Sequence, residues 1–149
     1  MFLIQSEKQL IDSFFPKDQR RLELPQGMRY PLVVRDYFAW GEPGGSKVFL
    51  LFAEPGAQKP IGIVFEREHP TGTPTAAICE WCHSFGSSNQ IGLLTLEVTP
   101  RRRVGVQLCR DLSCRQKIEM NLSLSPLAAQ ARSRRVVEEM SRLVRRLLL

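Results

Sequence analysis

The sequence lacks a long hydrophobic run. No stretch of its 149 residues approaches the roughly 18 consecutive apolar residues of a membrane-spanning helix. The apolar opening at residues 1–4 is followed at once by the polar residues 5–8, so we expect no signal peptide. These absences predict a cytoplasmic protein with no membrane partner, in a compartment where thiols stay reduced.

Histidine is scarce, and so are the side-chain combinations that carry catalysis. The chain has two histidines, His69 and His83, and histidine is the residue type that most often exchanges protons near neutral pH. Neither stands in a recognisable pattern with a nucleophile. The glycine-rich stretch 41–46 has no Gly-Lys-Ser/Thr sequence and no helix after it, so it predicts a turn and not a phosphate-binding loop. We therefore expect a binding protein, not an enzyme, with no small-molecule substrate.

Cysteine is also sparse, but its four copies stand in two close pairs. Two residues separate Cys79 from Cys82, four separate Cys109 from Cys114, and 26 lie between the pairs. A two-residue spacer lets one tight turn direct two thiolates at one ion. The second pair is expected at a strand end and in the first turn of a short helix capped by Asp111, where the helix dipole favours thiolate. This arrangement predicts a treble clef holding one structural Zn²⁺, with four thiolates completing the tetrahedron.

The same residues allow alternatives to this site. Residues 79–83, Cys-Glu-Trp-Cys-His, match a c-type haem attachment motif letter for letter. Haem attachment in most settings needs an exported chain, and it would leave Cys109 and Cys114 without a role. His83 could replace one cysteine as a zinc ligand, although a residue just beyond such a turn is more often an exposed neighbour. Four unligated thiols are the remaining alternative.

Apolar periodicity and turn residues predict an α+β fold in a single domain, residues 1–149. A short helix is expected at 6–15, capped by Ser6 and ended by Pro16. Short Gly/Pro-rich turns favour antiparallel pairing of the strands that follow. Alternation and β-branched residues place strands at 32–40, 48–53, 61–66, 91–99 and 103–108. The expected parts are an N-terminal helix with β-hairpins at 1–70, a zinc-finger core at 76–120 and a basic amphipathic helix at 125–149.

The C-terminal segment predicts a long helix. Ser125 is its expected N-cap, and Pro126 suits its first turn. One side carries the apolar residues Val137, Met140, Val144 and Leu147, and another carries Arg135, Glu139, Arg142 and Arg146. Helices in proteins gain most of their stability by packing an apolar side, so this side is expected to dock.

Charge is unevenly distributed along the chain. Residues 1–99 hold nine basic and eleven acidic side chains, a net charge of −2, whereas residues 100–149 hold twelve and four, a net charge of +8. Such a basic segment predicts an anionic partner, either a nucleic acid or an acidic protein surface.

Four side chains are candidates for contact with that partner. Arg101, Arg102 and Arg103 follow Pro100 in the turn of the second hairpin, where they would meet acidic protein, phosphate or water. Trp81 lies between two zinc ligands, and it either projects as an interface anchor or folds back over the metal. The other tryptophan, Trp40, ends a β run before a turn, so we expect it to be buried in the sheet.

Several motifs together resemble one known family. Residues 79–82 read Cys-Glu-Trp-Cys, residues 104–114 read Val-Gly-Val-Gln-Leu-Cys-Arg-Asp-Leu-Ser-Cys, residues 36–43 read Asp-Tyr-Phe-Ala-Trp-Gly-Glu-Pro, and residues 60–64 read Pro-Ile-Gly-Ile-Val. This set is similar to the elongation-factor-G-binding treble-clef zinc-finger family, which includes the zinc-binding part of fusidic-acid-resistance proteins. The second motif, with its Cys-x-Asp-Leu-x-Cys, is the most specific.

The resemblance implies a β-rich zinc-binding module. It implies docking on the translocase elongation factor G or on the ribosome, with the four cysteines as zinc ligands. The alternative that the residues themselves leave open is an RNA-binding zinc-finger protein that uses its basic C-terminal third.

Overall fold

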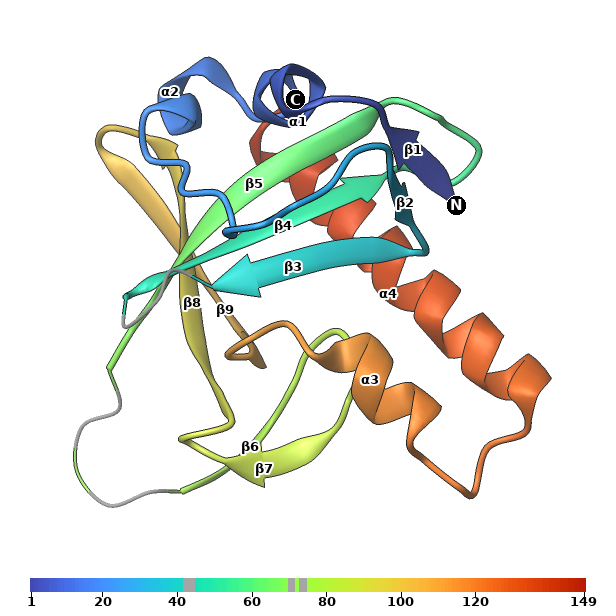
Figure 1. Ribbon diagram of the computed structural model, residues 1–149. Coiled ribbons are helices and arrows are strands. Elements are labelled where there is room, and N and C mark those ends of the chain that lie inside the picture. The colour runs from blue at the N-terminus through green and yellow to red at the C-terminus, as the bar shows by residue number, and fades with distance from the viewer. Residues whose placement is uncertain (42–44, 70–71, 73–74) are drawn as a thin grey trace.

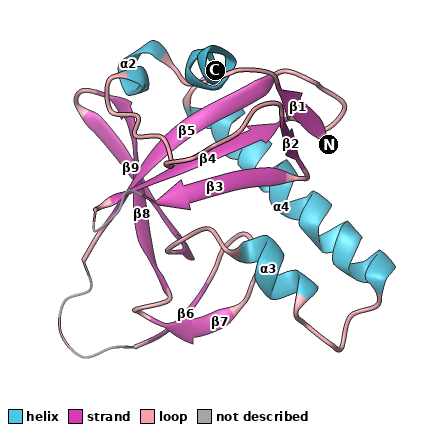
Figure 2. Ribbon diagram, viewed as in Figure 1, coloured by secondary structure: helices cyan, strands magenta, loops and turns pink. Residues whose placement is uncertain are grey.

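The computed structural model describes residues 1–41, 45–69, 72 and 75–149. At its centre lies a five-stranded antiparallel sheet, with helices and smaller sheets packed around it (Figures 1 and 2). The α+β fold with an antiparallel sheet is as the sequence predicts. Part of the expected turn at 41–46 and part of the expected loop at 69–75 lie outside the described residues.

The strand order of the central sheet is β3-β4-β5-β8-β9. The strands are β3 (Tyr37–Gly41), β4 (Lys47–Ala53), β5 (Pro60–Arg67), β8 (Ile91–Thr99) and β9 (Arg102–Cys109). Chain-adjacent strands form hairpins, and Phe65 on β5 pairs with Leu96 on β8 to join the two halves. Four of these five lie within a residue or so of their predicted positions, because alternating and β-branched residues mark them clearly.

Strand β4 shows why the sheet has two covered faces. Its side chains alternate, so Val48, Leu50 and Phe52 join one apolar core while Phe49 and Leu51 join the other. Both faces are buried, which explains why residues 48–53 of β4 are an unbroken apolar run.

The N-terminal segment covers one face. It comprises β1 (Phe2–Ile4), α1 (Glu7–Asp12), α2 (Pro16–Gln19) and β2 (Leu32–Val34), with β1 and β2 paired antiparallel. Its core contains Leu10, Phe14 and Trp40. Trp40 stacks on Phe49 with ring centroids 5.4 Å apart, and its indole N–H donates to the Glu23 carbonyl oxygen. The expected burial of Trp40 is confirmed, since only 9% of it is exposed.

Three expectations for this segment are wrong in detail. The helix predicted at 6–15 ends at Asp12, because Phe14 instead reaches β5 through an isolated bridge to Gly62. Pro16 opens α2, where its fixed φ suits the first helical turn, and does not end α1. The strand predicted at 32–40 is split by Asp36, whose positive φ of 67° breaks the extended backbone.

The opposite face is covered by α4 (Pro126–Leu147) and by the short elements around the cysteines (Figure 1). These are β6 (Ala76–Ile78), β7 (Phe85–Ser87) and α3 (Cys114–Glu119), and β6 and β7 form a small hairpin that the sequence did not predict. The Ser125 hydroxyl caps α4 by accepting from the Ala128 N–H, as expected. Val137, Met140 and Val144 are buried, so the predicted docking of this helix is confirmed.

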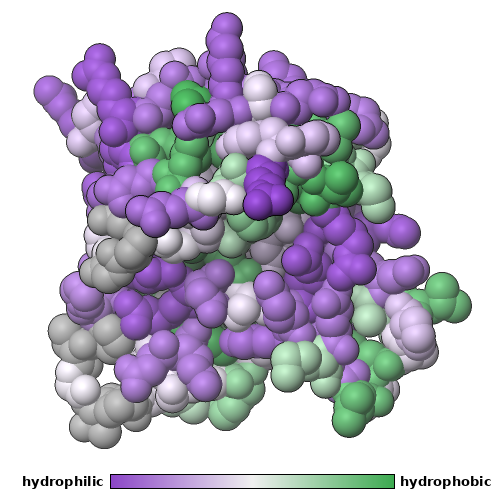
Figure 3. Space-filling view, in the orientation of Figure 1, coloured by the Kyte–Doolittle hydropathy of each residue, from purple (hydrophilic) through white to green (hydrophobic). Residues whose placement is uncertain are grey.

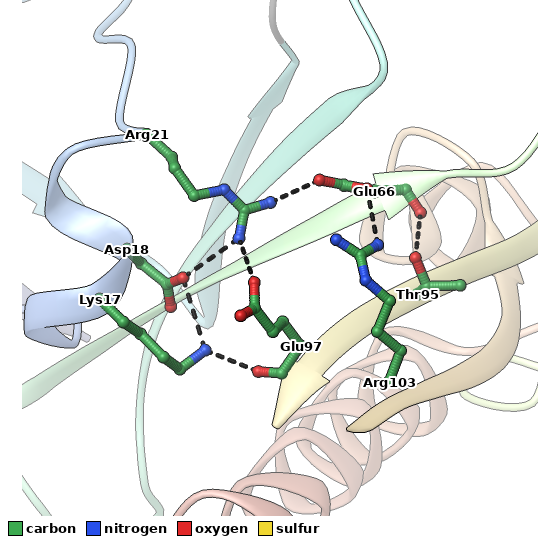
Figure 4. Close-up of polar contacts among 7 residues, drawn as sticks. All are labelled: Lys17, Asp18, Arg21, Glu66, Thr95, Glu97 and Arg103. Atoms are coloured by element: carbon green, nitrogen blue, oxygen red, sulfur yellow. Dashed lines mark hydrogen bonds and ion pairs between the residues drawn. The ribbon is translucent and has the colours of Figure 1, made fainter. Parts of the chain in front are cut away.

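Polar contacts join α2 and the residues just after it to β5 and β8 (Figure 4). Arg21 contacts Glu66 at 2.7 Å and Glu97 at 3.3 Å, and it lies 3.5 Å from the buried Asp18. Lys17 donates to the Glu97 carbonyl oxygen. Within the described part of the chain, no helix is long and apolar enough to cross a membrane.

Candidate metal centre

The first cysteine pair lies on a tight turn between β6 and β7. The Cys79 carbonyl accepts from the His83 N–H at 2.8 Å, and the Cys79 N–H donates to the Ser84 carbonyl at 3.0 Å. His83 closes the turn with a positive φ of 59°. Glu80 fastens the turn to β9, because its N–H donates to the Gln107 carbonyl and its carboxylate accepts from the Gln107 N–H. Both thiols of the pair are therefore held by backbone that cannot easily move.

The second pair lies at a strand end and a helix start, as predicted. Cys109 is the last residue of β9 and Cys114 the first of α3. Between them the Leu112 N–H donates to the Cys109 carbonyl, and Leu112 has a positive φ of 55°. The expected cap is wrong: Ser113 is the N-cap residue of α3, and Asp111 instead accepts from the Ser113 N–H in the preceding turn. A short side chain such as Asp bonds most readily to the backbone two residues ahead.

The fold brings all four sulfurs together. Their Sγ atoms lie within 4.8 Å of one another, and all four cysteines are buried. Cys79 and Cys114 are 3.7 Å apart at sulfur, and Cys82 and Cys109 are 3.6 Å apart. A disulfide would be about 2.05 Å, whereas Zn–S bonds near 2.3 Å in a tetrahedron separate the sulfurs by about 3.8 Å. The donor set therefore fits one structural zinc ion with no open position.

The ionisation of the thiols also calls for a cation. The pKa values of Cys79 and Cys114 are raised and those of Cys82 and Cys109 are lowered, with hydrogen bonds among the sulfurs as the first cause. Four thiolates this close repel one another, so they cannot all ionise unless a dication lies between them. Because all four cysteines lie together, Cys109 and Cys114 also serve as metal ligands. Haem attachment at Cys79 and Cys82 would give them no such role.

Two further side chains contact the sulfurs, and no motif in the sequence points to either. Lys117 on α3 donates from Nζ to the Cys109 sulfur at 3.2 Å, and the Ser84 hydroxyl lies 3.0 Å from the Cys82 sulfur. A four-thiolate zinc site carries a net charge of about −2, and the Lys117 ammonium offsets part of it. His83 is exposed and lies outside the sulfur cluster.

Tyr37 on β3 joins the central sheet to the loop between the second pair of cysteines. Its hydroxyl donates to the Leu112 carbonyl and accepts from the Arg115 N–H. Burial raises the pKa of Tyr37 well above its usual range, so the phenol keeps its proton. The sequence places Tyr37 in a strand but cannot show this contact, which spans 75 residues.

Trp81 does not project from the turn. It is only 4% exposed and packs edge-on against Phe65, with ring centroids 6.0 Å apart. Trp81 therefore folds back against the sheet, and the candidate interface anchor is part of the core. A side chain between two metal ligands on the inner side of the turn meets the sheet before it meets solvent.

The three candidate arginines differ from one another. Arg101 lies in the turn, but Arg102 and Arg103 already belong to β9, so the expectation of three arginines in the turn is wrong. Arg103 pairs with Glu66 at 2.7 Å (Figure 4). Because Glu66 and Glu97 lie close by, this end of the hairpin is less cationic than its sequence suggests.

Exposed apolar side chains gather at the corner between α3 and α4. Figure 3 shows a hydrophobic area there, at the lower right. Met120, Leu122 and Leu127, called here the apolar corner, are 77%, 100% and 79% exposed. Large exposed apolar residues in one place are typical of a contact surface for another molecule.

A hollow of about 910 Å³ lies between the β4–β5 turn, the α3–α4 connection and α4. Its volume is in the range of small-molecule sites. Two of its carboxylates have partners: Glu119 pairs with Arg35, and Glu54 accepts from the Ser141 hydroxyl and from Arg145. The Ser141 hydrogen bond first, and that of Arg145 next, lower the pKa of Glu54. The Glu54 contacts hold α4 against the β4–β5 turn, and the described residues of the lining include no histidine or cysteine.

Comparison with known proteins identifies this architecture. The model of the FBP C-terminal treble-clef zinc-finger family matches residues 9–148. The fold is similar to that in the structure of the fusidic acid resistance protein FusC, with a TM-score of 0.50 and 13% sequence identity. The similarity covers 95% of this chain and 55% of FusC, so the chain spans little more than half of that protein's length. No curated protein matches the chain.

Proposed function

The chain belongs to the FBP C-terminal treble-clef zinc-finger family, and on that premise we propose that it is a zinc-stabilised module that docks on elongation factor G or on the ribosome. The sequence motifs resemble proteins that bind this factor, and the fold is shared with a fusidic acid resistance protein. Because the chain corresponds to only part of FusC, both the partner and any link to drug resistance are parts of the proposal. Docking on such a partner places the protein in the cytoplasm.

The observation that carries the proposal is the apolar corner. Met120, Leu122 and Leu127 are at least 77% exposed, although leucine and methionine are normally buried. The corner begins where α3 ends, and α3 starts at the ligand Cys114. The zinc site therefore fixes its position, so little conformational entropy is lost when a partner covers it.

We further propose that the protein acts by binding and not by catalysis. Four buried thiolates leave zinc no position for a water or a substrate, which is the mark of a structural site. The role of the zinc ion is to fix the conformation of the binding surface.

Binding to purified elongation factor G, measured by calorimetry, tests the proposal. The double variant Leu122→Ser/Leu127→Ser is expected to bind at least about tenfold more weakly, as buried interface leucines contribute more than about 1 kcal/mol each. The matched control is Leu149→Ser, because Leu149 is also exposed, at 69%, but lies at the other end of α4.

Both variants should retain one zinc per chain and wild-type circular dichroism. If the wild type binds neither elongation factor G nor the 70S ribosome, the proposed partner is wrong. If it binds and the double variant binds equally well, the partner is right and the apolar corner is not the interface.

A further inference from the structure

A second surface lies where the zinc-binding turn meets α4. A small cavity of about 150 Å³ is lined there by Trp81, Cys82, His83, Ile118, Arg132 and Arg135. Its volume is below the roughly 300 Å³ at which small-molecule sites begin, so it admits one chemical group of a larger ligand. Among the described residues of its lining, the charged side chains are the two arginines, and His83 adds an imidazole ring.

The two arginines of this cavity are not neutralised by the fold. Within the described part of the chain, no carboxylate lies within ion-pair distance of Arg132 or Arg135, whereas Arg103 and Arg145 are paired with Glu66 and Glu54. Both arginines are exposed at their positions on α4. Because the guanidinium groups of Arg132 and Arg135 are exposed and form no ion pair, they are free to bind an anion.

The positive charge continues along the same side of α4. At 100° per residue, Arg132, Arg135, Arg142 and Arg146 fall within an arc of about 80°, and they extend over about 21 Å of helix. Arg142 pairs with Glu139, the acidic member of this row. The row therefore has a net charge of +3 and an extended shape.

We propose that this surface, consisting of the cavity and the arginine row, binds the phosphate backbone of single-stranded RNA. Guanidinium groups match phosphate oxygens with paired hydrogen bonds. A row of them suits a ligand whose charges repeat, while a single acidic side chain would occupy only the cavity. RNA backbones repeat in this way, and the cavity takes one phosphate between Arg132 and Arg135.

An exposed aromatic residue two positions along the chain from the cavity lining supports RNA over an acidic protein. Phe85 is 72% exposed and follows His83 by two residues, so their Cα atoms lie within about 7 Å. Exposed aromatic rings beside cationic grooves are the usual stacking platforms for unpaired bases. Backbone hydrogen bonds from Cys79 to His83 and to Ser84 fix the turn, so the backbone that carries His83 and Phe85 is preorganised for binding.

The test measures fluorescence anisotropy of a labelled 20-nucleotide single-stranded RNA of mixed sequence, at several salt concentrations. Arg132→Gln/Arg135→Gln is expected to weaken binding at least about tenfold and to reduce the slope of log K against log salt by about 1.4, for two lost phosphate contacts. The matched control, Arg101→Gln/Arg102→Gln, removes the same charge from the β8–β9 turn and should change binding less than threefold. Phe85→Ala should weaken binding at least about fivefold with no change in slope.

Each other outcome overturns the proposal. Absence of RNA binding by the zinc-loaded wild type excludes the proposal. Equal losses of RNA affinity in the two arginine variants would show nonspecific electrostatic attraction without a defined site. If the Arg132/Arg135 variant keeps RNA but loses elongation factor G, the cavity binds an acidic protein group instead. The surface uses no residue of the apolar corner, so the Leu122/Leu127 variant should bind RNA normally, and the two proposals can fail separately.

Discussion

The two faces of the central sheet are closed by different means. On the N-terminal face, the small sheet of β1 and β2 and two short helices form the cover, and Phe14 packs there against Trp40 and Phe49 of the central sheet. On the other face, α4 supplies a continuous apolar stripe, and four cysteines hold together elements that have little core of their own. Strands β6 and β7 have three residues each and α3 has six, which is too short for stability without a cross-link.

The comparison shows where a metal is needed. Apolar burial stabilises a cover in proportion to its area, and the N-terminal face has large aromatic rings for this purpose. The short elements around the cysteines bury Trp81, Leu112 and Ile118 but leave Ile78 and Phe85 exposed. Metal–sulfur bonds replace the missing apolar contacts there.

The largest expected effect follows removal of zinc. Cys114→Ser, or chelation of the wild type, should remove the metal and lower the thermal midpoint by more than about 10 °C, because binding energy at structural sites is folding energy. Hydrogen exchange should then rise first in residues 76–120 and later in the N-terminal face. Ser113→Ala is the control, since the Ser113 side chain makes no capping hydrogen bond. A metal-free wild type with an unchanged midpoint would contradict the role given to zinc.

The matching change on the other face is Phe14→Ala. Phe14 is 2% exposed, and its ring lies so close to Gly62 that a Cβ there would be 2.5 Å from its Cδ1 atom. Its removal should lower the free energy of unfolding by about 3–5 kcal/mol, measured by urea titration, while one zinc per chain is retained. Phe85→Ala removes an exposed ring and should change stability little. Loss of zinc from the Phe14 variant would mean that the two faces do not behave separately.

A smaller effect is expected at the link between the sheet and the zinc site. Tyr37→Phe leaves the buried Leu112 carbonyl and Arg115 N–H without their partner, which should destabilise the protein by about 1–3 kcal/mol. Transfer of zinc to a colorimetric chelator should also be faster. Tyr30→Phe is the control at the other tyrosine, and it should change neither the stability nor the rate of zinc transfer. Unchanged zinc release would show that the loop is held by its cysteines alone.

The smallest effect concerns Asp18, and it depends on pH. Burial raises the pKa of Asp18 above its ordinary 3.8, against the opposing attraction of Lys17 and Arg21, and within the described residues its Oδ2 has no hydrogen-bond partner. The folded state therefore keeps the proton to higher pH than the unfolded state, so the contribution of Asp18 to stability falls as pH rises from 3.8 through the folded pKa.

Asp18→Asn should abolish this fall of stability with rising pH. At pH 7 the free energy of unfolding of the variant should be within about 1 kcal/mol of the wild-type value, or slightly above it. Urea unfolding at pH 4, 5.5 and 7 measures it, with the exposed Asp12→Asn as control. A variant that is clearly less stable at pH 7 would show that the ion pairs of Asp18 outweigh its burial.

Much of the zinc site could be predicted from the sequence. Two short cysteine spacers limit the possible geometry so strongly that the ligands follow from spacing alone, and the family resemblance rests on the same residues. The long strands and α4 were predictable for a related reason. Each repeats its periodicity over enough residues to be distinguished from chance, and Ser125 with Pro126 marks a helix start.

Short elements and long-range contacts could not be predicted in this way. A three-residue strand such as β1 has no period, and it forms only because β2 lies beside it. The inward position of Trp81, the pairing of Arg103 with Glu66 and the contact of Tyr37 with Leu112 each join residues distant in the chain. Local sequence determines which conformations a segment prefers, but burial and charge pairing are set by neighbours that only the tertiary structure supplies.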